Sequence, residues 1–220
     1  MKLPYYTVLF PILVLVFSYN FISCSRSEPR ISHGFIQLVY YSGRDGIDER
    51  FSFFVLGEDD DGTENLSELY LFHDREGLRW NFDSEDWVVH SEDGKTWIGS
   101  RNIAMSGNLS LPRGQYRAVL VNKGGERTER TFTFDSPIVP PHPFPSFTVS
   151  DENYIVDSLY PINYFLGYDQ SGRIVESRVI QDKTGRISDL RFQNSVRSIA
   201  LWAENPSIVI SALTDAVSIR

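Results

Sequence analysis

Short strand-like runs separated by glycine turns constrain this chain more than any other feature of its sequence. From residue 34 onward the apolar residues show almost no helical periodicity, and the runs are rich in β-branched and aromatic residues, which favour strands. The glycine turns between the runs supply the positive φ that tight hairpins require; they are Arg44-Asp45-Gly46, Arg75-Glu76-Gly77, Glu92-Asp93-Gly94, Lys123-Gly124-Gly125, Gln170-Ser171-Gly172 and Lys183-Thr184-Gly185. The pattern predicts an all-β, antiparallel fold and excludes a Rossmann or TIM-barrel fold, which needs alternating strands and helices.

Two groups of runs flank a proline-rich segment. The strand-like runs lie at 35–41, 51–56, 69–72, 87–90, 96–98, 116–121 and 131–134, and then at 162–168, 174–180, 187–192, 198–203 and 207–211. Five of the nine residues at 137–145 are proline, which favours extended polyproline II and a semi-rigid linker. We therefore predict a first module at 34–136, a linker at 137–145 and a second small β module, sandwich-like, at 146–220.

One segment of the first module resembles a known family. Leu111-Pro112-Arg113-Gly114-Gln115-Tyr116 precedes an alternating run, a glycine turn and a second run. It resembles the Leu-Pro-x-Gly-x-Tyr segment before the last hairpin of many bacterial Ig-like and fibronectin-III-like domains. The resemblance covers roughly residues 109–134. It implies that residues 34–136 form an antiparallel Ig-like β-sandwich in which the Tyr116 hydroxyl bonds back to nearby backbone. It implies a fold and not an activity.

The first two dozen residues have the layout of an export signal. Lys2 is the only charged residue before Arg26, and residues 8–17 are apolar apart from Pro11. A short positive start, an apolar core of this length and a small residue after it are typical of a secretory signal. A membrane helix needs roughly 20 apolar residues, and this run is shorter.

The single cysteine of the chain, Cys24, lies just beyond that apolar core. Phe21-Ile22-Ser23-Cys24 resembles the lipobox of bacterial lipoproteins, with a small residue before the cysteine and phenylalanine where leucine is usual, as in the relaxed boxes of spirochaetes. The resemblance implies cleavage of a signal peptide at 1–23, acylation of Cys24 and a polar tether at 24–33 that holds the protein to an envelope membrane. A plain cleaved signal or an uncleaved anchor, with Cys24 incidental, remains an alternative.

Acidic residues are concentrated in one part of the first module. Residues 58–93 hold 13 acidic side chains against Arg75 and Arg79. The densest group, with Asp59, Asp60, Asp61, Glu64 and Glu68, does not fit an EF-hand, because the first ligand position would fall on a glycine and the flanks are strand-like. The favoured interpretation is a solvated hairpin tip. A loop calcium site of another kind and a face for a basic partner remain alternatives.

Three tryptophans lie close together after this acidic segment. Trp80, Trp87 and Trp97 fall within 18 residues of sequence. Aromatic side chains on a sandwich either pack in the core or form a platform for a sugar or a protein. We predict a possible contact surface or cation site formed by Asp59, Asp60, Asp61, Glu64, Glu68, Trp80 and Trp87.

The sequence carries no signal of catalysis. Its four histidines have no metal-ligand spacing, and it has neither a Gly-x-Ser-x-Gly elbow nor a phosphate-binding glycine loop. The net charge of −8 argues against a nucleic-acid partner. We expect a non-enzymatic, membrane-tethered envelope lipoprotein that acts as a binding module for an envelope protein and needs no cofactor. The alternatives are a structural or assembly accessory of the envelope, and, less favoured, a calcium- or carbohydrate-binding sandwich.

Overall fold

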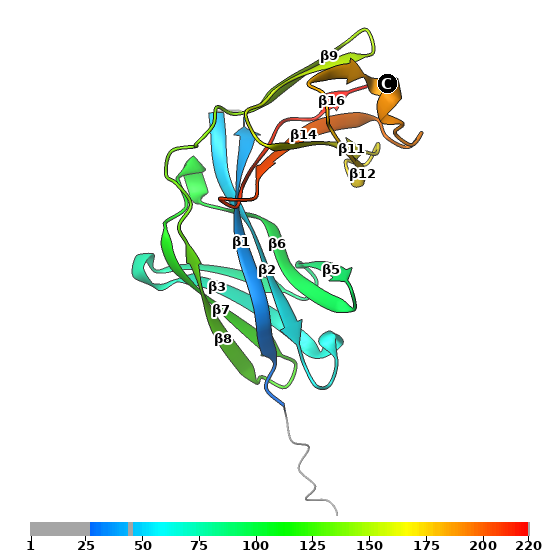
Figure 1. The fold of residues 1–220 in the computed structure, drawn as a ribbon. Helices are drawn as coiled ribbons and strands as arrows, with labels where there is room; N and C mark the ends of the chain where they lie inside the picture. Colours follow the sequence, from blue (N-terminus) through cyan, green and yellow to red (C-terminus); the bar gives the residue numbers. More distant parts are fainter. Residues whose placement is uncertain (1–26, 44–45, 220) are drawn as a thin grey trace, which may run out of the picture.

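The computed structural model describes residues 27–43 and 46–219, and this part of the chain is built almost entirely of strands (Figure 1). The predicted signal peptide and Cys24 lie outside the described residues. The strands are β1 (Arg30–Gly43), β2 (Gly46–Glu58), β3 (Leu66–His73), β4 (Leu78–Asp83), β5 (Val88–Glu92), β6 (Lys95–Ala104), β7 (Gly114–Asn122), β8 (Arg127–Phe134), β9 (Ser146–Ser150), β10 (Asn153–Asp157), β11 (Ile162–Tyr168), β12 (Ile174–Val179), β13 (Thr184–Arg186), β14 (Ser198–Asn205), β15 (Ile210–Leu213) and β16 (Val217–Ser218). Short 3-10 turns are η2 (Thr63–Asn65), η3 (Asp74–Glu76), η4 (Ser106–Asn108) and η5 (Ile187–Leu190). The all-β prediction is confirmed.

The first module is a sandwich of two sheets. One sheet has the order β4-β3-β7-β8, and the other contains β1-β2-β6-β5. Their facing side chains form one core, which includes Phe51, Phe53, Leu69, Tyr116 and Leu120. Period-two alternation explains this packing, because successive side chains of a strand point to opposite faces. Six of the seven runs predicted before the linker fall within strands, and the run at 87–90 does so from Val88 onward.

The segment before β7 is fixed by a tyrosine corner and a buried ion pair. The Tyr116 hydroxyl donates to the carbonyl of Pro112 at 2.7 Å, which confirms the bond that the Ig-like resemblance implies. Beside it, the Arg113 guanidinium donates to the Glu49 carboxylate at 2.8 and 3.0 Å. Both side chains of this pair are largely buried. These contacts attach the segment to β2 and set the start of the last hairpin.

The second module continues a sheet of the first. The larger sheet has nine strands, in the order β12-β11-β14-β15-β1-β2-β6-β5, with β16 also paired to β14. β15 pairs in parallel with β1, from Leu38 opposite Ile210 to Tyr41 opposite Leu213. Figure 1 shows β1 running from the first module up to this junction. Because β1 has 14 residues, it pairs with β2 along its length and with β15 near its end.

The second module also has a core of its own. The three-stranded sheet β13-β10-β9 covers one face of β11 and β14. Tyr154, Phe165 and Leu201 are buried between them, and the Phe165 ring lies 5.1 Å from Phe147 and 5.2 Å from Tyr154 between centroids. The other face of β11 and β14 turns away from this core.

The linker segment packs against both modules. Residues 137–145 contain no strand, and Phe144 packs against the core of the first module. The His142 ring meets the Tyr160 ring at 5.1 Å between centroids. With Tyr40 of β1, these residues border a hollow of about 410 Å³.

The sequence predictions are wrong at three places in the second module. The run predicted at 187–192 is not a strand: Ile187–Leu190 form η5, which ends at Arg191 with a left-handed φ of 52°. Gly185, predicted in a turn, lies in β13 opposite Tyr154, where a Cβ would lie 2.6 Å from the Tyr154 hydroxyl oxygen. The run at 207–211 becomes a strand only at Ile210, since Val209 has a φ of 54°.

Five strands of the structure were not predicted. β4, β9, β10 and β16 lie where the sequence predicts no strand, and β13 lies where it predicts a turn. The turn glycines Gly77, Gly94, Gly125 and Gly172 all have positive φ, as predicted. The missed strands are short and alternate polar with apolar residues, so their apolar content is low.

Candidate functional site

A groove of about 700 Å³ lies on the face of the nine-stranded sheet that is turned away from both cores. Side chains from β1, β2, β5 and β6 line it on one side, and side chains from β11, β12, β14 and β15 on the other. Six of its lining residues are aromatic: Phe35, Tyr41, Phe54, Trp97, Tyr164 and Trp202. Its volume is within the range of pockets that bind ligands.

The first wall of the groove is an aromatic cluster on β1, β2 and β6. Phe35 lies opposite Phe54 in the β1–β2 register, and their rings stack at 5.8 Å with an angle of 22°. The Trp97 ring lies 5.8 Å from Phe35. Phe35 keeps 41% of its surface exposed, so one aromatic face remains open to the groove. Gly99 lets β6 approach β2 here, because a Cβ would lie 2.0 Å from the Phe53 carbonyl oxygen.

The second wall is held in place by hydrogen bonds to one carboxylate. Trp202 donates its indole N–H to Glu204 at 3.0 Å, and the Tyr164 hydroxyl donates to the other oxygen of Glu204 at 3.5 Å. Tyr164 and Trp202 are also opposite each other in the β11–β14 register. Partial burial, with the nearby Glu204 carboxylate, raises the pKa of Tyr164. Both rings are therefore oriented before any ligand binds.

The floor of the groove crosses from one module to the other. Gln37 of β1 donates its amide N–H to the hydroxyl of Ser211 in β15 at 2.7 Å. Ser211 is fully buried. The two walls consequently stand on one continuous hydrogen-bonded sheet, and their spacing does not depend on a flexible linker.

The groove is close to neutral in a strongly acidic protein. Among the described residues that line it, Arg101 and Glu204 are the only members of the Asp, Glu, Lys and Arg types, against a net charge of −8 for the chain. Glu204 is its one carboxylate, and that carboxylate already accepts two hydrogen bonds. The site suits a neutral ligand with apolar surface.

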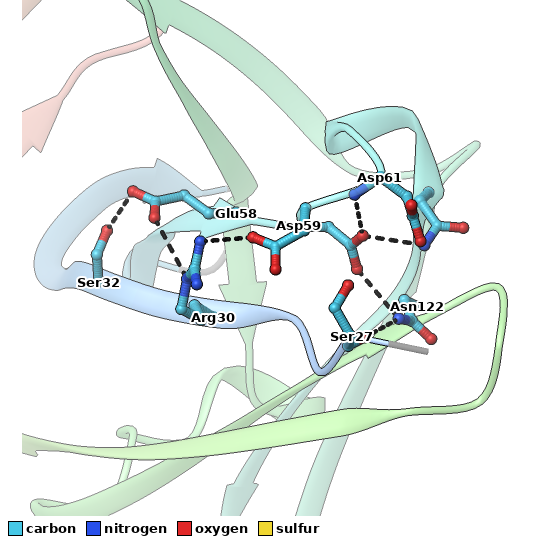
Figure 2. Close-up of polar contacts among 9 residues, drawn as sticks. Ser27, Arg30, Ser32, Glu58, Asp59, Asp61 and Asn122 are labelled. Atoms are coloured by element: carbon cyan, nitrogen blue, oxygen red, sulfur yellow. Dashed lines mark hydrogen bonds and ion pairs between the residues drawn. The ribbon is translucent and has the colours of Figure 1, made fainter. Parts of the chain in front are cut away.

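The acidic tip predicted as a contact surface organises the start of β1. The Asp59 carboxylate accepts hydrogen bonds from the Asp61 N–H, from the Asn65 amide and, at 3.0 Å, from the Asn122 amide. Asn122 also donates to the carbonyl of Ser27 at 3.0 Å, as Figure 2 shows. Burial raises the pKa of Asp59, but these hydrogen bonds outweigh it and hold the pKa below its ordinary value.

The neighbouring carboxylates of the tip hold Arg30 at the beginning of β1. Arg30 donates to Asp60 at 2.8 Å. Its guanidinium also lies 3.8 Å from the Glu58 carboxylate (Figure 2). Glu64 lies in η2, and Glu68 in β3. Within residues 27–43 and 46–219, no group of three His, Cys, Asp or Glu side chains is arranged to hold a metal ion.

The predicted tryptophan platform is divided by the fold. Trp80 and Trp87 are partly buried and pack against the core of the first module. The Trp80 ring lies 6.1 Å from Tyr116 and 6.3 Å from Phe51. Trp97, the third member of the sequence cluster, lines the groove instead. A contact surface at Trp80, Trp87 and the acidic tip stays a prediction, and the structure does not bring them into the groove.

The groove itself was missed by the sequence analysis. Its residues come from eight strands. The local signal was the alternation within the predicted runs, which puts Phe35 and Gln37 on the face opposite to Ile36 and Leu38. Cys24 lies outside the described residues. The described part of the chain has no helix long and apolar enough to cross a membrane.

Comparison with known proteins gives little beyond this geometry. No family model matches the chain, and no curated protein matches it. A crystal structure of the Dpr11 IG1 domain bound to DIP-gamma is 12% identical, with a TM-score of 0.27, and covers 86% of this chain and 99% of its own. Murine CEACAM1b is 10% identical, with a TM-score of 0.26, and covers 84% and 99%. Scores of this size establish no common arrangement, so the fold rests on the strand pairing described above.

Proposed function

We propose that this chain is a non-catalytic lipoprotein, tethered to an envelope membrane through Cys24, whose groove binds a protein of the cell envelope. The observation that carries the proposal is the aromatic groove shared by both modules. Aromatic side chains are enriched in the energetically dominant parts of protein interfaces. Phe35 offers an open ring, and Trp202 is already oriented by Glu204, so little conformational entropy is lost when a partner binds.

The chemistry of the groove supports binding without catalysis. Hydrolysis of a glycosidic bond ordinarily needs two carboxyl groups facing one ligand, and the groove has Glu204 alone. The Glu204 carboxylate orients Trp202 and Tyr164, which is a structural role. A binding role needs only that Glu204 keeps the Trp202 and Tyr164 rings in these orientations.

The position of the first described residues supports a tether. Ser27 and Arg30 are held by Asn122 and Asp60 at one end of the first module (Figure 2). In Figure 1 this end lies at the bottom, while β14, β11 and β12 lie at the top. A tether that leaves from the bottom places the second module and its wall of the groove away from the membrane.

The tether is tested by the intact mass of the N-terminal peptide, from protein extracted in detergent from its native cells. A peptide that begins at Cys24 and carries added acyl mass supports the proposal. A peptide that begins beyond Cys24, or at Cys24 without lipid, contradicts the tether and leaves a secreted or periplasmic protein.

The binding role is tested with Phe35→Ala in the full-length protein. The size of the detergent-solubilised protein is measured by native mass spectrometry or sedimentation. We expect a complex with an envelope protein that the variant weakens at least tenfold. Tyr70→Ala is the matched control, because Tyr70 is an aromatic residue of β3, on the other sheet, stacked on Phe72. A complex that survives Phe35→Ala unchanged contradicts the groove as the binding site.

A further inference from the structure

Both ends of the nine-stranded sheet border the groove. Along the sheet, β12 is the first strand and β5 the last, and within the described residues neither pairs with a second strand. His90 of β5, and Ile174 and Ser177 of β12, nevertheless line the same groove. The sheet therefore curls until its two edges stand on opposite sides of one hollow; Figure 1 shows β5 and β12 on the same side of β1.

The outer edge of β12 presents backbone hydrogen-bonding groups without a partner strand. Ile180 donates its N–H to the Asn163 carbonyl at 2.9 Å, so Asn163 and Ile180 form a hydrogen-bonded pair. Along two antiparallel strands, hydrogen-bonded pairs alternate with pairs whose N–H and C=O groups point away from each other. The pairs Tyr164–Val179 and Leu166–Ser177 are thus non-hydrogen-bonded, and the N–H and C=O groups of Val179 and Ser177 point away from β11. The Ser177 carbonyl accepts a hydrogen bond from the exposed Arg178 guanidinium at 3.1 Å, and no other strand pairs with this edge in the described residues.

The side chains of β12 leave this edge apolar on the groove face. Ile174 is 47% exposed and Val179 58% exposed. Ser177 lines the groove, and period-two alternation puts Val179 on the same face. Glu176 and Arg178 point to the opposite face, where they pair with each other and contact the backbone near η5. Edge strands that stay in water usually carry charges or proline as protection from pairing, and the groove face of β12 has neither.

From this edge we infer that the groove takes an extended polypeptide segment of the partner, added as a strand to the free edge of β12. This inference rests on the proposed function and names how the partner is recognised. The backbone of the segment pairs with Val179 and Ser177, where its N–H replaces the Arg178 guanidinium at the Ser177 carbonyl, and its alternate side chains enter the aromatic groove. Arg101 and Glu204 offset each other in charge, so the side chains that enter are neutral and apolar.

The test uses the full-length protein and two synthetic decapeptides. Both alternate valine and threonine between terminal lysines, and one is N-methylated at its six central amides. Methylation removes the backbone donors and keeps the side chains and the charge. Because Trp97 and Trp202 line the groove, tryptophan fluorescence and backbone NMR shifts report binding. We expect the unmethylated peptide to bind, with shifts at β12, and the methylated peptide to bind at least tenfold more weakly.

Variants locate the bound segment. Val179→Pro removes an outward N–H and no bond to β11, and it should weaken peptide binding at least tenfold. The matched control is Thr133→Pro, at an exposed, outward-facing position of β8, the edge strand of the other sheet. Ile174→Asp, which puts a charge into the groove, is the second variant should Val179→Pro fail to fold.

Three results overturn strand addition: equal binding of both peptides, no binding of either, whether or not a sugar binds the groove, or unchanged binding by both the Val179 and Ile174 variants. If Phe35→Ala still disrupts the native complex in such a case, the proposed binding role stands and strand addition alone fails. If Phe35→Ala leaves the complex intact, the proposed function fails as well.

Discussion

Replacement of Glu49 by glutamine should destabilise the protein by about 3 kcal/mol. The side chains of Glu49 and Arg113 are 8% and 16% exposed. The carboxylate accepts two hydrogen bonds from Arg113 and one from the Leu111 N–H at 3.0 Å. Loss of one partner of a buried pair costs about 3–5 kcal/mol. The lower value applies because Arg113 still donates to the carbonyls of Leu111, Ser136 and Pro137.

The assay is urea unfolding at pH 7, followed by tryptophan fluorescence. For a chain of this size, about 3 kcal/mol corresponds to a fall in Tm of about 6–12 °C. Glu76→Gln is the control, since its carboxylate contacts Arg75 with both side chains substantially exposed, and it should change stability by less than about 0.5 kcal/mol. A Glu49→Gln protein within about 0.5 kcal/mol of the parent refutes the buried pair.

Three further substitutions test the fold and its acid response. Tyr116→Phe removes the tyrosine-corner hydrogen bond and should cost about 1–2 kcal/mol in urea unfolding; no loss contradicts the corner's role. Gly99→Ala places a Cβ 2.0 Å from the Phe53 carbonyl oxygen and should cost about 1–3 kcal/mol; a neutral result refutes the close β2–β6 approach. The lowered pKa of Asp59 stabilises the folded state above the ordinary carboxyl pKa of about 4, and this contribution disappears as pH falls through the folded value. In Asp59→Asn the free energy of unfolding should therefore fall less steeply as the pH drops below about 4. An unchanged pH dependence in that range contradicts the stabilising role of Asp59.

The strands of the first module other than β4 were predictable because each is encoded by local sequence. The runs at 51–56 and 116–121 combine β-branched and aromatic residues with alternation, and the Leu-Pro-x-Gly-x-Tyr segment carries the geometry of the Tyr116 corner within six residues. The positive φ of Gly77 and Gly172 follows from the same local rule. Arg191 and Val209 also have positive φ, but they are not glycines, so the sequence carried no signal that the strand-like runs would be interrupted there.

The groove was not predictable because it depends on contacts between distant strands. The Gln37–Ser211 bond joins residues 174 apart in sequence, and the parallel β1–β15 pair has no local signal. The role of Asp59 is similar: Asn122, which fixes it, is 63 residues away. Acidic composition alone suggested an exposed contact face, whereas tertiary hydrogen bonds use part of it to hold β1.

Hydrogen–deuterium exchange of the full-length protein, free and in its native envelope complex, tests the groove most directly. We expect slowed exchange in the complex at β12, above all at the amides of Ser177 and Val179, which point away from β11, with smaller changes in the groove-lining parts of β1 and β6. Exchange in the acidic segment 58–64 should be the same in both states. Protection at 58–64, with β12 unchanged, would contradict the groove and place the contact surface at the acidic tip.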